Sequence, residues 1–115
     1  AFQTVDVLRA AEADLGVGLG ELRVDGGMTA NSLLMQFQAD VLGVDVVRPQ
    51  VTETTALGAA YAAGLAVGYW SSVDDLRANW REGARWSPAM EAPTVERLLR
   101  EWHKAVEKAS GWVDA

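Results

Sequence analysis

Cysteine is absent from the 115 residues of this sequence, and histidine occurs once. The absence of cysteine excludes disulfide bonds and thiolate metal sites, and it is compatible with the cytoplasm, where we expect the protein. The single histidine, His103, stands among polar residues with no second ligand nearby in the chain. We therefore interpret it as a solvated side chain and predict no metal site within these residues.

Positive charge and long apolar runs are also scarce. Ten lysines and arginines stand against sixteen acidic residues, which gives a formal net charge of −6 and an isoelectric point near 4.6. Nucleic-acid binding relies on clustered basic residues, so we expect no DNA or RNA partner. No run approaches the roughly 20 apolar residues that span a bilayer, and the first residues carry no basic targeting segment, so we expect no membrane span.

Several nucleotide-binding and catalytic motifs are missing as well. The chain has no Gly-Lys pair and hence no Walker-type phosphate loop. The glycine-rich segment "GVGLG" at 16–20 precedes a strand-like run, which is the wrong order for a dinucleotide fold, so we interpret it as a connection. No set of serine, histidine and aspartate can be assembled, and we assign no catalytic residue to these positions.

What the chain does contain is an alternation of helical and strand-like patterns. Apolar residues recur every three to four positions over 2–15 and again over 33–42, and a glycine follows each segment. Short apolar runs at 22–24 and 44–49 are typical of strands. The order of helix, strand, helix and strand predicts an α/β fold.

The segment 52–68 is rich in alanine and glycine and has almost no charge after its start. Such a composition is typical of a helix that approaches a neighbouring backbone closely. We expect a helix with Thr52 as its N-cap, buried on most of its circumference and packed through Gly58, Ala60 and Gly64.

The rest of the chain is richer in tryptophan, aspartate and arginine. We predict a short capped helix within 71–80, a loop at 81–88 and a final helix over 93–109 with one apolar face. Irregular spacing favours core or interdomain packing, rather than a sugar platform, for the five tryptophans. They are Trp70, Trp80, Trp86, Trp102 and Trp112.

The stretch "VDGGMTAN" at 24–31 is a candidate binding site. Its two glycines follow a strand and precede a helix, so the backbone can approach a ligand and the first helical amides can bind an anion. A tight turn with a helix cap and nothing bound explains the same residues equally well. Asn31 is a ligand contact in the first interpretation and a cap in the second. Asp25 is either a ligand-facing carboxylate or a buried turn-former.

A longer block, "LRVDGGMTANSLLMQFQADVLGVDVVRPQVTETTALGAAYAAGLAVGYW", resembles the C-terminal portion of the FGGY family of carbohydrate kinases, and within that family the glycerol kinases. The resemblance runs from about Leu22 to the end of the chain. It implies an α/β piece of an actin-like, ribonuclease H-like ATPase domain, namely the last part of the second domain. A nucleotide-binding core segment at 1–70 would be followed by a helical C-terminal wrap at 71–115.

The resemblance also implies the chemistry. In the family the paired glycines approach ATP or ADP, and an asparagine at the start of the next helix contacts the adenosine end. By position these residues are Gly26, Gly27 and Asn31. The family usually has small residues directly after the glycines, where this chain has Met28 and Thr29. The whole kinase would transfer the γ-phosphoryl group of ATP to glycerol with the help of Mg²⁺.

Other expectations follow from the same resemblance. The glycerol pocket, the catalytic aspartate and most of the Mg²⁺ site would lie upstream of Ala1. We therefore expect a fragment that is inactive alone and that belongs to a homo-oligomeric parent. Two alternatives stay open: the same portion of another FGGY kinase, acting on xylulose or gluconate, and a non-catalytic interaction module of the same fold.

Overall fold

The structure, a computed structural model, describes residues 1–111, so Trp112 and the three positions after it lie outside the described part. Helices alternate with short strands along the chain. In order they are α1 (Phe2–Leu15), β1 (Glu21–Arg23), the 3₁₀ helix η1 (Gly27–Ala30), α2 (Ser32–Leu42), β2 (Asp45–Pro49), α3 (Thr54–Ala66), α4 (Val73–Arg77), β3 (Glu82–Trp86) and α5 (Ala92–Ala109).

The amphipathic helices form where the sequence predicts them, and glycine ends two of them. α1 and α2 are each followed by a glycine in the left-handed conformation, with φ at 68° for Gly16 and 75° for Gly43. The short helix α4 has a capping box, in which the side chains of Ser72 and Asp75 each accept from the other residue's backbone N–H. α5 has Pro93 in its first turn, where a missing N–H is tolerated.

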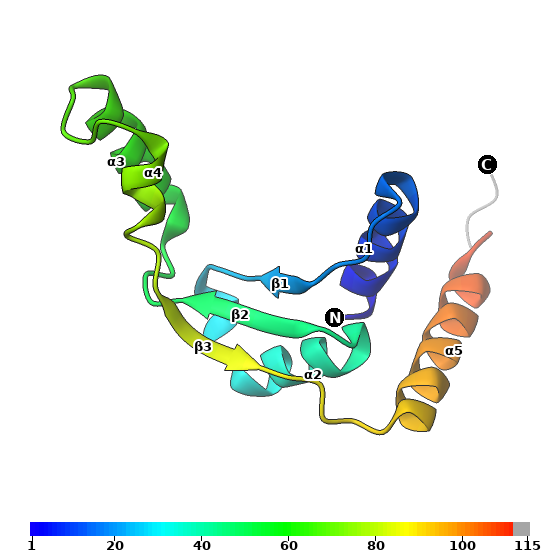
Figure 1. Ribbon diagram of the computed structural model, residues 1–115. Coiled ribbons are helices and arrows are strands. Elements are labelled where there is room, and N and C mark those ends of the chain that lie inside the picture. Colours follow the sequence, from blue (N-terminus) through cyan, green and yellow to red (C-terminus); the bar gives the residue numbers. More distant parts are fainter. Residues whose placement is uncertain (112–115) are drawn as a thin grey trace.

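β2 is the central strand of a three-stranded sheet within the described residues. It pairs with β1 in parallel and with β3 antiparallel, so that Val46 lies between Leu22 on one side and Trp86 on the other. A parallel pair needs a crossover, and α2 supplies it between β1 and β2. The turn that contains η1 therefore lies after the carboxyl end of β1, directly before α2 (Figure 1). The predicted α/β fold is confirmed.

The predicted loop at 81–88 is wrong, because β3 occupies Glu82–Trp86 and pairs with β2. Gly83 and Pro88 make this segment resemble a loop locally, whereas its pairing partner lies far earlier in the chain. A Cβ at Gly83 would lie 2.8 Å from the carbonyl oxygen of Pro49, so the two strands approach closely here because the residue is glycine. The predicted helical wrap thus contributes a strand to the sheet.

The predicted N-cap of α3 is also wrong. Glu53 takes that position without a hydrogen bond from its side chain, and the helix begins at Thr54. Thr52 precedes the helix, and its carbonyl oxygen accepts a hydrogen bond of 2.9 Å from the N–H of Gly26. This bond ties the start of α3 to the turn after β1.

α2 packs against two separate clusters of buried apolar side chains in the described part of the chain. One cluster joins α2 to the sheet, and the other joins α2 to α1 and α5. Full burial of one aliphatic side chain contributes about 1.5–3 kcal/mol, so each cluster is a substantial stabilising term. The first is centred on Met35, Ala39 and Val46, and the second on Val5, Val41 and Leu99.

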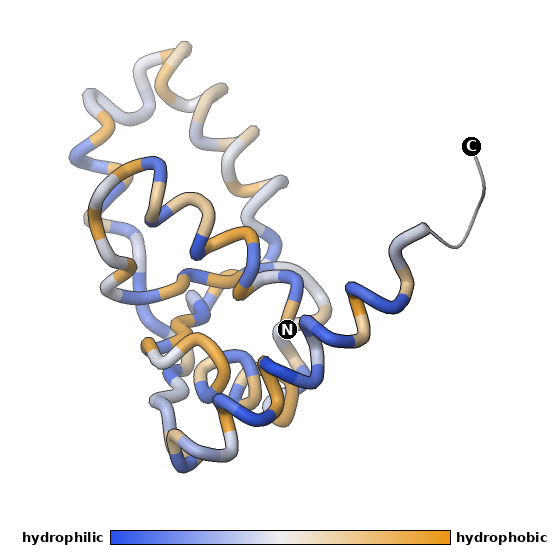
Figure 2. Tube along the Cα trace, turned by 90° about the vertical axis from the view of Figure 1, so that its right-hand side faces the viewer, coloured by the Kyte–Doolittle hydropathy of each residue, from blue (hydrophilic) through white to orange (hydrophobic). Residues whose placement is uncertain are grey.

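α1 and α5 are held together by aromatic packing and a partly buried hydrogen bond. Phe2 packs edge-on against Phe37 with ring centroids 5.5 Å apart, and it stacks on Trp102 at 5.6 Å. The indole N–H of Trp102 donates to a carboxylate oxygen of Asp6 over 2.7 Å. Figure 2 shows hydrophilic and hydrophobic residues alternating along α5, which leads to the C-terminus. The predicted apolar face of this helix is the one that meets α1.

A carboxylate on α2 holds the connection between β3 and α5. Asp40, only 9% exposed, accepts hydrogen bonds from the backbone N–H groups of Ala89 (2.7 Å) and Met90 (3.2 Å). Gln36, one turn earlier, donates to Asp40 over 3.0 Å and to the carbonyl oxygen of Ser87 over 2.8 Å. Hydrogen bonds to an ionised acceptor are stronger than neutral ones, so α2 fixes the place where α5 begins.

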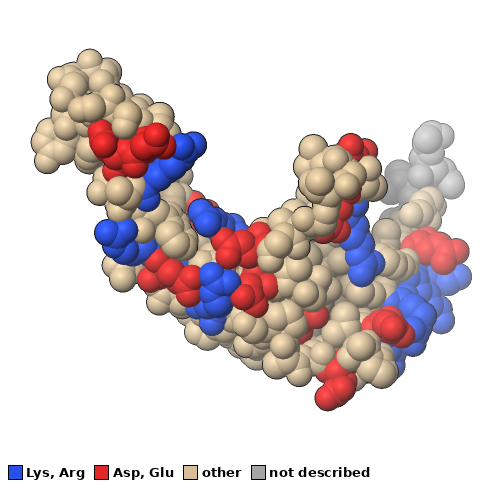
Figure 3. Space-filling view, in the orientation of Figure 1, with Lys and Arg blue, Asp and Glu red and all other residues tan. Residues whose placement is uncertain are grey.

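α3 is not buried on most of its circumference, contrary to the prediction. The described chain measures 54 × 40 × 30 Å with a radius of gyration of 18.1 Å, whereas a compact chain of this length would have about 13 Å. α3 and α4 form an arm that projects from the sheet, and its tip shows no charged side chain on the visible face (Figures 1 and 3). Gly58 and Ala60 are exposed because little of the chain covers this arm, so the predicted packing through them is wrong for residues 1–111, whereas Gly64 is buried against Trp70.

Three strands are tied together on their exposed side by Arg85 of β3. Its guanidinium donates to Asp45 (2.7 Å), Glu82 (2.7 Å) and Glu21 (3.3 Å). Figure 3 shows acidic and basic side chains intermingled over this part of the sheet. The hydrogen bond from Arg85 lowers the pKa of Asp45, and the pKa of Glu21 is lowered first by Arg23 and then by Arg85.

We expect Arg85→Met to lower the melting temperature at neutral pH by a few degrees. We also expect the melting temperature of this variant to fall less as the pH is lowered. Carboxylates with lowered pKa values stabilise the folded state above their ordinary pKa values, and this contribution is lost as the pH falls below about 4.5. Melting curves between about pH 7 and pH 3 measure the effect. An acid dependence identical to that of the unmodified chain would contradict the role of Arg85.

Substitution at Gly64 tests the packing within the α3–α4 arm. A Cβ there would collide with the ring of Trp70, which packs edge-on against Tyr61 at 5.1 Å. We expect Gly64→Ala to destabilise the arm by about 1–3 kcal/mol. Gly58→Ala is the matched control: its Cβ meets no atom within 4 Å among residues 1–111, and alanine favours a helix by about 0.5–1 kcal/mol. Urea denaturation followed by tryptophan fluorescence compares them, and equal effects would refute the packing.

Candidate functional site

The turn between β1 and α2 contains the three residues that the sequence indicates, Gly26, Gly27 and Asn31. Gly26 has φ at 82° and ψ at 173°, a backbone conformation that is open to glycine and strained for other residues. Its N–H donates to the carbonyl oxygen of Thr52. The first glycine is therefore required by the geometry of the turn itself.

Thr29 closes the turn from the inside. The residue is 3% exposed, and both its hydroxyl (2.6 Å) and its N–H (3.1 Å) donate to the carbonyl oxygen of Gly26. The N–H of Asn31 donates to the carbonyl oxygen of Met28 over 3.1 Å. These bonds make the turn a closed 3₁₀ segment with a defined shape.

The outer side of the turn is open. A Cβ on Gly27 would meet no atom within 4 Å among residues 1–111, and its φ lies outside the left-handed region. Met28 is 69% exposed. Asp25 is exposed too, so its interpretation as a buried turn-former is wrong. The turn presents bare backbone on its outside, as the close approach of a ligand requires.

Asn31 caps α2. Its side-chain oxygen accepts a hydrogen bond of 3.0 Å from the N–H of Leu34, and its backbone is extended, as at most N-caps. The cap interpretation is therefore confirmed. The side chain is also exposed, so the cap does not exclude a contact with a ligand.

A basic residue behind the turn has no counterpart in the sequence prediction. Arg48 of β2 donates from Nη1 to the carbonyl oxygen of Thr29 over 2.8 Å. Its guanidinium lies 5.5 Å from the ring centre of Trp86 on β3. Sequence patterns gave no signal for this contact, because it joins a strand to a turn nineteen positions earlier.

His103 lies away from this turn, on α5. Its Nε2 is 3.0 Å from Asp6, and half of its side chain is exposed. Hydrogen bonds from Trp102 and then His103 lower the pKa of Asp6. Residues 1–111 contain no group of three potential metal ligands and no helix long and apolar enough to cross a membrane.

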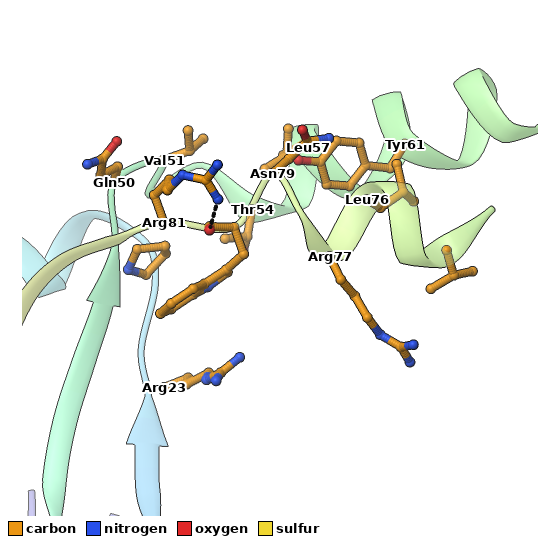
Figure 4. A pocket seen from close by; sticks show the side chains of 13 residues that line it. Arg23, Gln50, Val51, Thr54, Leu57, Tyr61, Leu76, Arg77, Asn79 and Arg81 are labelled. Atoms are coloured by element: carbon orange, nitrogen blue, oxygen red, sulfur yellow. Dashed lines mark hydrogen bonds between the residues drawn. The ribbon is translucent and has the colours of Figure 1, made fainter. Parts of the chain in front are cut away.

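A cleft of about 600 Å³ lies between the sheet and the α3–α4 arm. Figure 4 shows Leu57 and Tyr61 of α3 on one side of it, with Arg23 of β1 opposite. None of the three predicted site residues lines it. The cleft adjoins the turn at 26–31, called the glycine turn below. Val51 lines the cleft, and the next residue, Thr52, accepts the hydrogen bond from Gly26 of the turn.

The arginines around this cleft are already engaged. Arg23 pairs with Glu21 over 2.9 Å and lies 4.5 Å from the ring centre of Trp80. Arg81 donates to the carbonyl oxygen of Trp80 over 2.8 Å (Figure 4), and Arg77 pairs with an aspartate of its own helix. The lining is mostly apolar and offers no acid and base pair. We therefore place the candidate site at the glycine turn and not in the cleft.

Comparisons with known proteins agree on one family. Residues 1–67 match the FGGY family of carbohydrate kinases, C-terminal domain. The glycerol kinase of Clavibacter michiganensis subsp. michiganensis is 68% identical over 114 residues, which make up 99% of this chain and 23% of that protein. The solved glycerol kinase of Plasmodium falciparum with ADP is 34% identical with a TM-score of 0.80, over 97% of this chain and 22% of that one.

A more distant structure supports the fold. The gluconate kinase of Lactobacillus acidophilus has a TM-score of 0.71 at 17% identity, over 83% of this chain and 20% of that one. These likenesses confirm the prediction of a piece of an actin-like ATPase domain. The chain spans less than a quarter of the length of each of these proteins.

The two glycines of the turn have different structural requirements. We expect Gly26→Ala to destabilise the chain by about 1–3 kcal/mol, because alanine is strained at φ 82°. Gly27→Ala should change the stability by less than about 0.5 kcal/mol, since its Cβ enters open space. Urea denaturation measures both variants. Similar losses for the two would contradict the conformation described for this turn.

Proposed function

Because the chain belongs to the FGGY family of carbohydrate kinases, we propose that it is the C-terminal nucleotide-binding portion of an ATP-dependent glycerol kinase. The whole enzyme would transfer the γ-phosphoryl group of ATP to glycerol and give glycerol 3-phosphate. The observation that carries this proposal is the outward-facing glycine turn, in a chain similar to a glycerol kinase solved with ADP. Residues 1–70 would be the nucleotide-binding core and 71–115 the C-terminal wrap.

The residues of the turn have distinct roles in this proposal. Gly26 supplies the backbone conformation, and Gly27 lets the backbone come against the nucleotide where a side chain would intrude. Asn31 serves both as the cap of α2 and as a contact to the adenosine end. Its oxygen accepts from Leu34, so we assign its Nδ2 amino group to the nucleotide.

The remaining parts of the chemistry belong elsewhere in the whole kinase. Mg²⁺ would neutralise charge on the phosphates during transfer. Residues 1–111 contain no three-ligand cluster that could hold it alone, so we assign most of its site to other segments. We assign the catalytic base and the glycerol pocket there as well. The homo-oligomer and the cytoplasmic location are further proposals, supported by the family resemblance and the composition.

Glycerol is favoured over the sugar acids and ketoses that other members of the family phosphorylate. The chain is 68% identical to one glycerol kinase and 34% identical to another, against 17% for the gluconate kinase. Only the low-identity likeness points to gluconate, and at that level it supports the fold and not the substrate. We therefore retain glycerol as the acceptor.

The test uses a chimera in which this chain replaces the matching segment of the Clavibacter michiganensis glycerol kinase, to which it is 68% identical. We expect Gly27→Val to raise the KM for ATP at least about tenfold, because a side chain would overpack the nucleotide. The KM for glycerol should stay within about twofold. A Cβ at Gly27 meets no atom within 4 Å among residues 1–111, so a folding defect is not the expected cause.

Gly20→Val is the matched control, since Gly20 also faces open space in a loop and its φ is not positive. It should leave both KM values unchanged. The isolated chain serves as the negative control and should release no ADP in response to glycerol, because it offers only one part of a two-domain site. An unchanged KM for ATP in Gly27→Val, or an equal rise in both KM values, would refute the placement of the nucleotide.

A further inference from the structure

Arg48 lies where it can control the shape of the glycine turn from behind. It stands on the central strand β2, and its side chain reaches across to η1, where Nη1 donates to the carbonyl oxygen of Thr29 over 2.8 Å. The flat guanidinium also lies over the ring of Trp86 on β3, with 5.5 Å to the ring centre. The outer strand and the turn are thereby linked through one side chain.

The contact made by Arg48 continues into the turn. Thr29, which receives this bond, donates to the carbonyl oxygen of Gly26 from both its hydroxyl and its N–H. In a trans peptide the C=O and the following N–H point in opposite directions. Because the Gly26 carbonyl points inward to Thr29, the N–H of Gly27 points away from Thr29. Arg48 and Thr29 together therefore fix the orientation of the backbone that the nucleotide would meet.

The shielding of one polar atom of the half-buried Arg48 is difficult to explain by stability alone. Its Nε is shielded from solvent and has no hydrogen-bond partner among residues 1–111. A shielded polar group without a partner is destabilising, and an apolar side chain on the same strand would avoid that penalty. Arg85, one strand away, differs in this respect, since it binds three carboxylates at the exposed side of the sheet.

We propose that Arg48 is a positioning residue for the nucleotide: by holding the Thr29 carbonyl, it sets the conformation of the glycine turn and hence the affinity for ATP. This inference rests on the proposed function, in which the turn binds the nucleotide. Because the proposal assigns the glycerol pocket to other segments of the kinase, we expect Arg48 to affect the KM for ATP and to leave the KM for glycerol unaltered.

The experiment uses the same chimera and measures kcat and both KM values. Arg48→Met removes the guanidinium donor and keeps an unbranched side chain, and we expect it to raise the KM for ATP about tenfold with the KM for glycerol within about twofold. Arg48→Lys retains one donor but loses the planar contact with Trp86, so it should restore part of the affinity. A purely structural role would not produce this selective loss and partial rescue.

Two further variants keep the result decisive. Thr29→Val removes the hydroxyl at the next step and should raise the same KM, which tests the proposal even if Arg48→Met folds poorly. Arg85→Met is the matched control, because it removes another arginine of the sheet that does not contact the turn. It should lower the melting temperature without a selective change in the KM for ATP.

Parallel measurement of Gly27→Val separates the possible failures. If Gly27→Val raises the KM for ATP but Arg48→Met and Thr29→Val do not, the positioning role is wrong and the nucleotide site stands. If Gly27→Val also leaves this KM unchanged, both the site and the positioning role are overturned. Equal losses for Arg48→Met and Arg85→Met, or losses shared by ATP and glycerol, would reduce Arg48 to a structural residue.

Discussion

The burial of α2 on two sides is the constraint on which the rest of the structure depends. One side of the helix covers the sheet through Met35 and Ala39, and another meets α1 and α5 through Val41. No other helix of the described residues takes part in both clusters. Since the glycine turn leads directly into α2, the turn is attached to the best-packed helix of the chain. Its position relative to the sheet follows from that packing.

Local patterns were sufficient to predict much of this fold. α1, α2 and α5 form where apolar residues repeat every three to four positions, and Gly16 and Gly43 end the first two because glycine adopts positive φ readily. β3 was missed because its strand conformation comes from pairing with β2, which no local pattern reveals. The composition of α3 correctly predicts a helix, but composition does not tell whether the segment that covers the helix lies within the same residues.

The candidate site was predictable to the extent that its signals are local. Gly26 is needed for a positive φ angle and Asn31 for the N-cap of α2. Both requirements can be recognised from a short stretch of sequence. Arg48 contacts the turn from β2, nineteen positions later in the chain, so the sequence could not indicate it. The nucleotide interpretation still rests on the likeness to known kinases and on the open backbone at Gly27.

The pairing of α1 with α5 has a consequence for how the polypeptide is made. Val5 and Leu99 share one cluster, and Asp6 accepts its hydrogen bond from Trp102, ninety-six positions later. Contacts so distant along the chain form late, since a long loop must close first. While the ribosome is still synthesising the intervening residues, the apolar face of α1 has no α5 to cover it. Until α5 is made, this face is covered by α2 alone and exposes apolar surface that can lead to aggregation.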